Sequence, residues 1–204
     1  MKKLFRNTLG IVAAAILLTT SGCDGLTALP ADFAGSAGTA SVGAQADPRS
    51  GEAVDCYFPR AGQDAQAELI RVIRSADSTL DMAIYSFTDT DVADAVVACS
   101  RRGVAVRVIS DKTQSGNEYQ KKVLARLKKE KIPVKVDSHS GIMHLKVTIA
   151  DGKTATTGSY NYTKSADEEN DEVFVVLHDE EIAQDFEREF ESMWNDGKRF
   201  EDYR

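Results

Sequence analysis

The segment MHLKVTIADGKTATTGSYNYT, residues 143–163, joins a strand pattern to a group of polar side chains. Its first part, HLKVTIAD, alternates between polar and apolar residues, as a strand does when its two faces meet different surroundings. His144 and Lys146 fall on one face, and the apolar residues from Leu145 onward fall on the other, which we expect to face the core. The segment therefore predicts a strand that presents an imidazole and an ammonium side by side.

The residues that follow return toward that strand. DGK predicts a turn, and TATTGS predicts a second strand that carries Ser159 and Asn161 at its end. A histidine, a cation and two neutral donors are the groups that a phosphodiester requires. The imidazole attacks phosphorus or carries a proton, while the other groups hold the non-bridging oxygens as negative charge builds on them.

Strand and helix patterns alternate through the first half of the domain, and strands dominate its middle. Thr90 and Asp179 are expected to cap two helices at their N-termini, and Gly103 to end one. No internal repeat is visible. The pattern predicts an α/β fold with a mixed β-sheet that is flanked by helices on both faces. Besides the hairpin, the predicted strands are VDCYF, TLDMAIYSF, VAVRVIS, VKV and EVFVVLH, and the predicted helices are QDAQAELIRVIRSA, TDVADAVVACSRRG, NEYQKKVLARLKKEK and about residues 179–196.

The spacing of the polar residues resembles the signature of a known family. H-x-K-x4-D runs from His144 to Asp151, and G-S-x-N runs from Gly158 to Asn161, as in the phospholipase D superfamily. AIYSFTD, SRRGVAVRVISD, IPVKVDS, GSYNYTKSADEENDE and a tryptophan-bearing final helix are similar to the small bacterial endonuclease branch of that family. The resemblance covers nearly the whole domain and implies the phospholipase D nuclease fold.

The resemblance also implies roles for individual residues. His144 would form a covalent phosphohistidine intermediate, and Lys146, Ser159 and Asn161 would bind phosphate. Glu172 would hydrogen-bond the other nitrogen of the imidazole, which fixes its tautomer and steadies the imidazolium. A second copy of the motif would supply the histidine that protonates the leaving oxygen. Glu172 also lies in the acidic run DEENDE, and such runs are usually solvated surfaces.

Other residues near the motif have less specific interpretations. Strand geometry carries Asp151 to the turn, so we expect a structural role, bracing that turn. His139 and His178 lack the accompanying lysine. His178 is interpreted as structural or surface, and His139 as a loop residue that can border the substrate cleft. Tyr160 and Tyr162 are interpreted as core residues, at least one of them, with base stacking as the alternative.

The helix pattern NEYQKKVLARLKKEK carries the densest positive charge of the chain. A solvated helix surface is the ordinary interpretation. The alternative is contact with a phosphate backbone, and anionic membrane headgroups would be attracted equally well. The residues predicted to bind substrate there are Lys121, Lys122, Arg126, Lys128 and Lys129.

The N-terminal region reads as a targeting segment rather than part of the domain. A basic start, the apolar run IVAAAILL and the small residues TTSGC predict an export signal over residues 1–22. TTSGC also resembles a lipoprotein cleavage box with Cys23 as the lipidated residue, although Thr20 departs from the usual leucine. Ordinary signal cleavage is the alternative. If Cys23 is lipidated, Asp24 resembles an inner-membrane retention signal.

The remaining regions follow from composition. Residues 23–52 are rich in Ala, Gly, Ser and Thr and predict a flexible tether, and residues 53–204 form the predicted nuclease domain. The protein is thus expected to be exported, and to be periplasmic or associated with the cell envelope. In an oxidising compartment Cys56 and Cys99 form either a disulfide or two free thiols.

The net charge and the motifs of the chain limit how it can bind a polyanion and whether its reaction uses a metal ion. Removing the three basic residues of the signal from 25 leaves 22 against 32 acidic residues, a formal charge of −10. This argues against broad electrostatic coating of nucleic acid, so any polyanion needs a local basic surface. No metal-binding motif is visible, and we expect a metal-independent reaction without a cofactor.

The leading hypothesis is an exported phosphodiesterase that cleaves DNA or RNA with low sequence specificity. The alternatives are a phospholipase D-type hydrolase of membrane phospholipids and a binding module without activity. The chemistry calls for two histidines, yet the chain carries one copy of the motif. A homodimer with a shared active site on a two-fold axis is therefore predicted.

Overall fold

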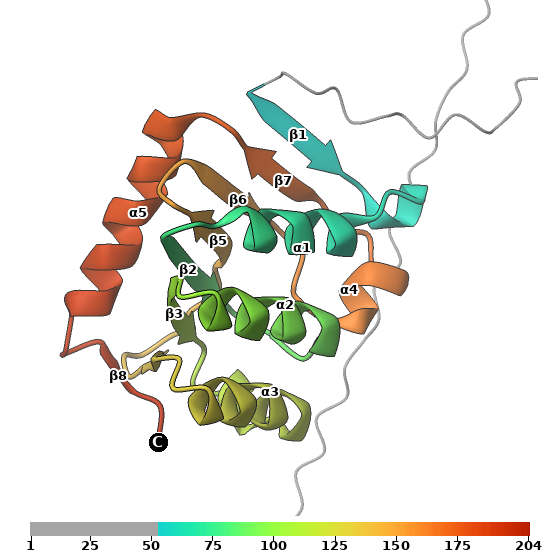
Figure 1. Ribbon diagram of the computed structural model, residues 1–204. Coiled ribbons are helices and arrows are strands. Elements are labelled where there is room, and N and C mark those ends of the chain that lie inside the picture. Colours follow the sequence, from blue (N-terminus) through green and yellow to red (C-terminus); the bar gives the residue numbers. More distant parts are fainter. Residues whose placement is uncertain (1–52) are drawn as a thin grey trace, which may run out of the picture. The chain divides into compact units, whose positions relative to one another are not determined.

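The computed structural model describes residues 53–204. The predicted export signal, the tether and Cys23 lie outside the described residues. Within residues 53–204 the strands form one eight-stranded mixed sheet in the order β1-β7-β6-β5-β2-β3-β4-β8, with helices on both faces (Figure 1), as predicted. None of the helices in this part of the chain is both long and apolar enough to cross a membrane. In chain order the elements are β1 (Val54–Tyr57), α1 (Ala65–Ser75), β2 (Thr79–Ile84), α2 (Thr90–Arg101), β3 (Ala105–Ser110), α3 (Glu118–Lys129), β4 (Val134–Asp137), β5 (Lys146–Ala150), β6 (Thr154–Gly158), α4 (Lys164–Glu168), β7 (Phe174–Leu177), α5 (Glu180–Asn195) and β8 (Phe200–Asp202), with short 3-10 turns η1 (Pro59–Ala61) and η2 (Gln114–Gly116).

The long helices begin at side chains that accept hydrogen bonds from the first free N–H groups. Asp179 caps α5 by accepting from the N–H of Ile182, which confirms that prediction. The predicted cap of α2 was wrong by one residue, because Asp89 and not Thr90 accepts the N–H bonds of the first turn. Gly103 has φ of 96° just after α2 and ends that helix as predicted, since this backbone conformation costs glycine little.

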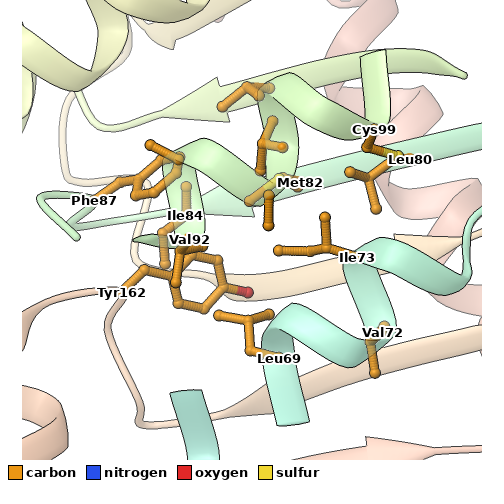
Figure 2. Packing of buried hydrophobic residues seen from close by; sticks show 14 of the residues in the cluster. Leu69, Val72, Ile73, Leu80, Met82, Ile84, Phe87, Val92, Cys99 and Tyr162 are labelled. Carbon is orange, nitrogen blue, oxygen red and sulfur yellow. The ribbon is translucent and has the colours of Figure 1, made fainter. Parts of the chain in front are cut away.

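The core has two layers because successive side chains of β2 point to opposite faces of the sheet. Helices α1, α2 and α3 cover one face and α5 covers the other (Figure 1). Figure 2 shows Leu69 and Ile73 of α1 and Val92 of α2 gathered around Met82 and Ile84 of β2. Burial of such side chains contributes roughly 1.5–3 kcal/mol each. Both faces of the sheet are thus mostly apolar and covered by helices, so functional groups are expected at the ends of the strands.

The strand pairing brings several chain segments together at one end of the strands. Strands β2, β3 and β4 run parallel, and β5 runs antiparallel to β2, so that Ile84 at the end of β2 pairs with Lys146 at the start of β5. Gly158 at the end of β6 pairs with Phe174 at the start of β7. The residues just outside these positions meet at the carboxyl ends of β2 and β3. Open α/β sheets bind ligands at this end of their strands.

The turn between β5 and β6 lies at the opposite end of the strands and is braced by Asp151. Asp151 and Gly152 both have positive φ, 55° and 61°, as a tight hairpin turn of the primed type requires. The Asp151 carboxylate accepts the backbone N–H groups of Asp77, Ser78 and Thr79 at 2.7–2.9 Å. Burial alone would raise the pKa of Asp151, but these three bonds hold it below its ordinary value. This is the geometry of a structural residue, as the sequence predicted.

Replacing Asp151 with Ala should destabilise the fold by about 1–3 kcal/mol, because three N–H groups lose their acceptor. Asp151→Asn should cost less, since it keeps one acceptor and tolerates positive φ. A carboxyl group with a lowered pKa stabilises the fold above the ordinary aspartate pKa, and this contribution is lost as the pH falls through its folded-state pKa. Urea unfolding at several pH values measures both effects, and folded Asp151→Asn should retain full activity. Loss of activity without loss of stability would contradict the structural role.

The two cysteines of the domain are free thiols, which was one of the two predicted alternatives. Cys56 lies exposed on the edge strand β1, whereas Cys99 is buried on α2, beneath the helix layer that covers β2. Burial raises the pKa of the Cys99 thiol, although Arg102 beside it opposes the rise. The disulfide alternative is not realised in this structure, because the two side chains point to different surroundings on separate elements.

Candidate active site

The structure brings together the five residues predicted to be catalytic, at the carboxyl ends of β2 and β3. His144 is exposed just before β5, and Lys146 is the first residue of that strand. Ser159 and Asn161 follow β6, and Glu172 precedes β7. Because β5, β6 and β7 are neighbours in the sheet, segments 28 residues apart in sequence meet here.

Lys146 is almost completely buried, with 6% of its surface exposed. Its Nζ donates a hydrogen bond to the backbone carbonyl of His144 at 2.9 Å and lies 5.0 Å from the centre of the Tyr85 ring. Burial lowers the pKa of the ammonium, and the negative charge of Glu172 works against that change. A buried cation with one hydrogen-bond acceptor is poised to receive an anionic ligand.

Glu172 is held by donors rather than by the imidazole. The Ser159 hydroxyl accepts the N–H of Val173 at 3.1 Å and donates to the Glu172 carboxylate. Nδ2 of Asn170 donates to the other carboxylate oxygen at 3.0 Å. The expected hydrogen bond from the His144 ring to Glu172 is not formed in this structure, because the two carboxylate oxygens accept from Ser159 and Asn170 instead.

Asn161 leaves a polar atom without a partner. Its Oδ1 is buried and accepts no hydrogen bond from any of the described residues. Unpaired buried polar groups are rare, and each calls for an explanation such as a ligand that is not present. Oδ1 is an acceptor, so the partner that it lacks is a hydrogen-bond donor, while Nδ2 of the same amide can donate to an anion.

Gly158 is required by the close approach of two strands. Its φ is 131°, and a Cβ placed on it would lie 2.2 Å from the carbonyl oxygen of Val173. The same carbonyl accepts the N–H groups of Ser159 and Tyr160 at 3.0 and 3.4 Å. A side chain at this position would push β6 away from the segment that carries Glu172, so glycine keeps Ser159 and Glu172 in register.

Tyr85 contacts the site and was missed by the sequence reasoning. Its ring packs edge-on against the imidazole of His144, with the two centres 4.7 Å apart, and also covers Lys146. Tyr85 lies two residues before the end of the predicted strand TLDMAIYSF. Its contact with the motif depends on the pairing of β2 with β5, which no local pattern reveals.

A hollow of about 390 Å³ adjoins His144. His139 lines it together with Ile142, Leu145 and Phe200, so His139 lies in the same hollow as His144. Leu145 is 40% exposed and Ile142 is 51% exposed. The prediction that Leu145 faces the core was wrong, because β5 begins only at Lys146 and its covered apolar face starts with Val147.

The other residues considered near the motif lie in the fold rather than at the site. Tyr160 and Tyr162 are fully buried, and the hydroxyl of Tyr162 bonds that of Thr148 at 2.7 Å. Burial raises the pKa of Tyr162 to about 12. His178 bonds the Asp55 carboxylate at 2.8 Å and thereby links β7 to β1, which agrees with a structural role.

The basic residues of α3 are exposed above a buried side formed by Val123, Leu124 and Leu127. Lys121 and Lys122 lie in the first turns of the helix, the end that the Gln120 side chain connects to the backbone of Tyr85. Lys129 lies about 12 Å further along at 1.5 Å per residue. The five predicted residues are thus spread along the helix: Arg126 pairs with Asp94, Lys122 lies over the Tyr119 ring, and Lys128 lies over the Tyr203 ring, while Lys121 and Lys129 are exposed.

Among residues 53–204, no group of three or more His, Cys, Asp or Glu side chains is arranged to hold a metal ion. The ionisable side chains among the five predicted catalytic residues are one imidazole, one ammonium and one carboxylate. The chemistry that this donor set itself offers is nucleophilic attack by the imidazole, with charge stabilisation by Lys146 and the neutral donors.

Comparison with known proteins places these residues in a wider context. A family model described as "Cardiolipin synthase, PLD-like domain" matches residues 69–194. The chain is 33% identical over 131 residues to a phospholipase D of Rickettsia prowazekii, covering 64% of this chain and 62% of that protein. It is 32% identical over 146 residues to the human mitochondrial cardiolipin hydrolase, covering 70% of this chain and 56% of that protein. The chain thus spans about three fifths of the length of these curated relatives.

Two solved structures are similar over almost their whole length. Nuc from Salmonella typhimurium, a phospholipase D family member, aligns with a TM-score of 0.69 and 32% identity, covering 74% of this chain and 97% of Nuc. NucT from Helicobacter pylori aligns with a TM-score of 0.64 and 31% identity, covering 69% of this chain and 94% of NucT. The fold described above is therefore the fold of these two proteins.

Proposed function

We propose, from the premise that this chain belongs to the phospholipase D-like family, that it is a phosphodiesterase of the single-motif endonuclease branch. Its substrate is DNA or RNA, cleaved with low sequence specificity, and His144 is the nucleophile. The observation that carries this proposal is the set of donors around an anion at the sheet edge. The Ser159 hydroxyl and the Asn170 amide bond the carboxylate of Glu172, and Lys146 lies near it.

An arrangement that holds a carboxylate in this way also fits a phosphate oxygen. Both anions accept hydrogen bonds from hydroxyl and amide groups and are stabilised by a buried cation. A phosphodiester at this place would take the Ser159 hydroxyl and the charge of Lys146, and Nδ2 of Asn161 would donate to a non-bridging oxygen. Glu172 would then be released from Ser159 and freed to orient an imidazole.

The proposed reaction has two steps. An imidazole nitrogen of His144 attacks phosphorus, so that an N–P bond forms and the P–O bond to the leaving oxygen breaks. A second histidine gives its proton to that oxygen. The same second histidine then takes a proton from water, the water oxygen attacks phosphorus, and the N–P bond breaks to release a phosphomonoester. Lys146, Ser159 and Asn161 stabilise the negative charge on the non-bridging oxygens in both steps.

Nucleic acid is the favoured substrate class because of surface charge and chain extent. The exposed lysines Lys121 and Lys122 lie at the end of α3 that adjoins the site, where they can contact a phosphate backbone. The match also spans nearly all of Nuc and NucT but only about three fifths of the curated phospholipase and hydrolase relatives. The second candidate is phospholipid hydrolysis, which the apolar residues Ile142 and Leu145 beside His144 favour.

A substrate panel tests the proposal. The purified domain is incubated with plasmid DNA, RNA and labelled phospholipid vesicles, each in excess EDTA and with added Mg²⁺ or Ca²⁺. We expect DNA or RNA cleavage in EDTA, because the site supplies its own cation. Cleavage of phospholipid alone would support the second candidate, and complete loss in EDTA that added metal restores would contradict a metal-independent reaction.

We also propose that the active species is a homodimer with one active site on its two-fold axis. The described chain provides one motif, and the exposed apolar residues Ile142 and Leu145 beside His144 suit a covered, isologous surface. Two His144 side chains would then approach one phosphate from opposite sides, one to attack and one to carry the proton. Each Glu172 would offset part of the positive charge of the two Lys146 residues.

Mixing wild-type chains with inactive His144→Asn chains distinguishes a shared site from independent sites. After subunit exchange, activity should fall with the square of the wild-type fraction, because only dimers with two wild-type chains are complete. A linear fall, or an active monomer in sedimentation, would contradict the dimer. His139→Asn is the matched control, since His139 borders the same hollow. If His139→Asn were as inactive as His144→Asn, the second histidine would belong to the same chain.

Export and membrane attachment are further parts of the proposal, and they rest on the sequence of residues 1–52. The protein would be periplasmic or held at the cell envelope, with its lipid on Cys23 at the inner membrane. Growth with labelled palmitate should label the wild type and not Cys23→Ala. Absence of label in the wild type would favour ordinary signal cleavage.

A further inference from the structure

Tyr85, the first residue after β2, is joined to the motif at three points. Its ring centre lies 4.7 Å from that of His144 and 5.0 Å from Nζ of Lys146. Its backbone N–H donates to the carbonyl of Leu145, the residue between these two, at 2.8 Å. The ring and the backbone of Tyr85 therefore bear on the same short stretch of chain.

The polar end of Tyr85 is held from the opposite direction. Nε2 of Gln114, in η2, donates to the Tyr85 hydroxyl at 3.0 Å. Nε2 of Gln120, the buried residue at the start of α3, lies 3.4 Å from the Tyr85 carbonyl and 2.8 Å from the hydroxyl of Ser110. The position of the ring is thus determined by two elements besides the strand that carries it.

Asp111 connects the two sides of this arrangement. Its carboxylate is 1% exposed, and one oxygen accepts the N–H of Gln114 at 2.7 Å. The other oxygen accepts the N–H of Met143 at 3.2 Å. Because Met143 immediately precedes His144, one buried carboxylate fixes both the residue that holds the Tyr85 ring and the backbone that carries the imidazole.

We propose that Tyr85, held by Gln114 and Asp111, is a positioning residue that orients His144 and covers Lys146. The inference rests on the phosphodiesterase reaction proposed above. A nucleophile displaced by about 1 Å loses roughly 10²-fold in rate, so a group that fixes the imidazole contributes to turnover without touching phosphorus. The aromatic face also stabilises the ammonium of Lys146, which donates a single hydrogen bond within residues 53–204.

Packing in the core does not account for an aromatic ring at this position. Tyr160 and Tyr162, which serve the core, are 1% and 0% exposed. Tyr85 is only partly buried, and its ring faces His144 and Lys146 and is absent from the apolar cluster. The ring of Tyr85 thus contacts the site and not the core.

The test uses full-length protein with Tyr85→Phe and Tyr85→Leu, and Tyr203→Leu as the matched control. Tyr203 bonds the start of β4, at the other end of the sheet from the site. Tyr85→Leu should lower kcat roughly 10- to 100-fold. Tyr85→Phe keeps the ring and should stay within about threefold of the wild type, and Tyr203→Leu should keep wild-type kcat after correction for its folded fraction. Thermal unfolding checks that each variant is folded.

A second readout needs no activity. In NMR spectra the ring protons of His144, assigned by their loss in His144→Asn, should be shifted by the Tyr85 ring in the wild type and in Tyr85→Phe. That shift should disappear in Tyr85→Leu, which should also bind inorganic phosphate at least fivefold more weakly. Unchanged His144 shifts in Tyr85→Leu, or equal losses in Tyr85→Phe and Tyr85→Leu, would overturn the inference. A wild type without nuclease or lipase activity would instead defeat the proposed function, and the NMR readout would still decide the role of Tyr85.

Discussion

His144→Asn is expected to abolish phosphodiester cleavage while the domain remains folded. The side chain is exposed before β5 and lies outside both apolar clusters, so its replacement removes chemistry and little packing. Asparagine has no ring nitrogen able to form an N–P bond, and the proposed route has no second nucleophile. We expect less than about 1% of wild-type kcat, in keeping with losses of 10⁴-fold or more when nucleophiles are removed.

Two observations make that result interpretable. Circular dichroism and the unfolding midpoint of His144→Asn should match those of the wild type. His178→Asn, which breaks only the bond to Asp55 at the sheet edge, should retain turnover. Activity of His144→Asn above about 1% would show that another group attacks phosphorus.

Lys146→Met should give the second large loss, roughly 10²- to 10³-fold in kcat, the range for removal of one charge-stabilising donor. Methionine has a similar length, fills the buried position and cannot hold a phosphate oxygen. Lys146→Arg should not restore activity, because the longer planar group does not fit the space that Tyr85 covers.

Lys146→Met should leave the free energy of unfolding unchanged or raise it. Burial lowers the pKa of Lys146, which means that the fold disfavours the charged form. Wild-type stability should therefore rise as the pH increases from the folded-state pKa toward the ordinary lysine pKa, and Lys146→Met should lack this rise. Urea unfolding from pH 7 to pH 10 measures it. An inactive Lys146→Met that is also strongly destabilised would contradict a purely functional role for this lysine.

The parts of the site that lie close together in sequence were predictable. The turn at Asp151 and Gly152, and the return of the chain to Ser159, follow from alternation and turn residues within one short segment. The α/β class follows in the same way, because strand-like and helix-like hydrophobic patterns alternate along the chain. The error at Leu145 arose where a local pattern was extended past the true start of β5.

The parts of the site that the sequence did not predict depend on contacts between distant segments. Tyr85 reaches His144 only because Ile84 pairs with Lys146 across strands 62 residues apart in sequence. Glu172 meets Ser159 rather than the imidazole because Gly158 lets β6 approach Val173. Asp111 acts on Met143 across a loop, and a buried aspartate has no distinctive spacing to reveal such a role.

The most direct test of the central claim is to trap the covalent intermediate. Wild-type protein is mixed with an oligonucleotide carrying labelled phosphate, quenched with alkali within the first turnover, and digested for mass spectrometry. A phosphoramidate is stable in alkali and hydrolyses in acid, so we expect label on His144 that acid removes and that His144→Asn never acquires. Turnover without labelled protein, or label on any other residue, would contradict His144 as the nucleophile.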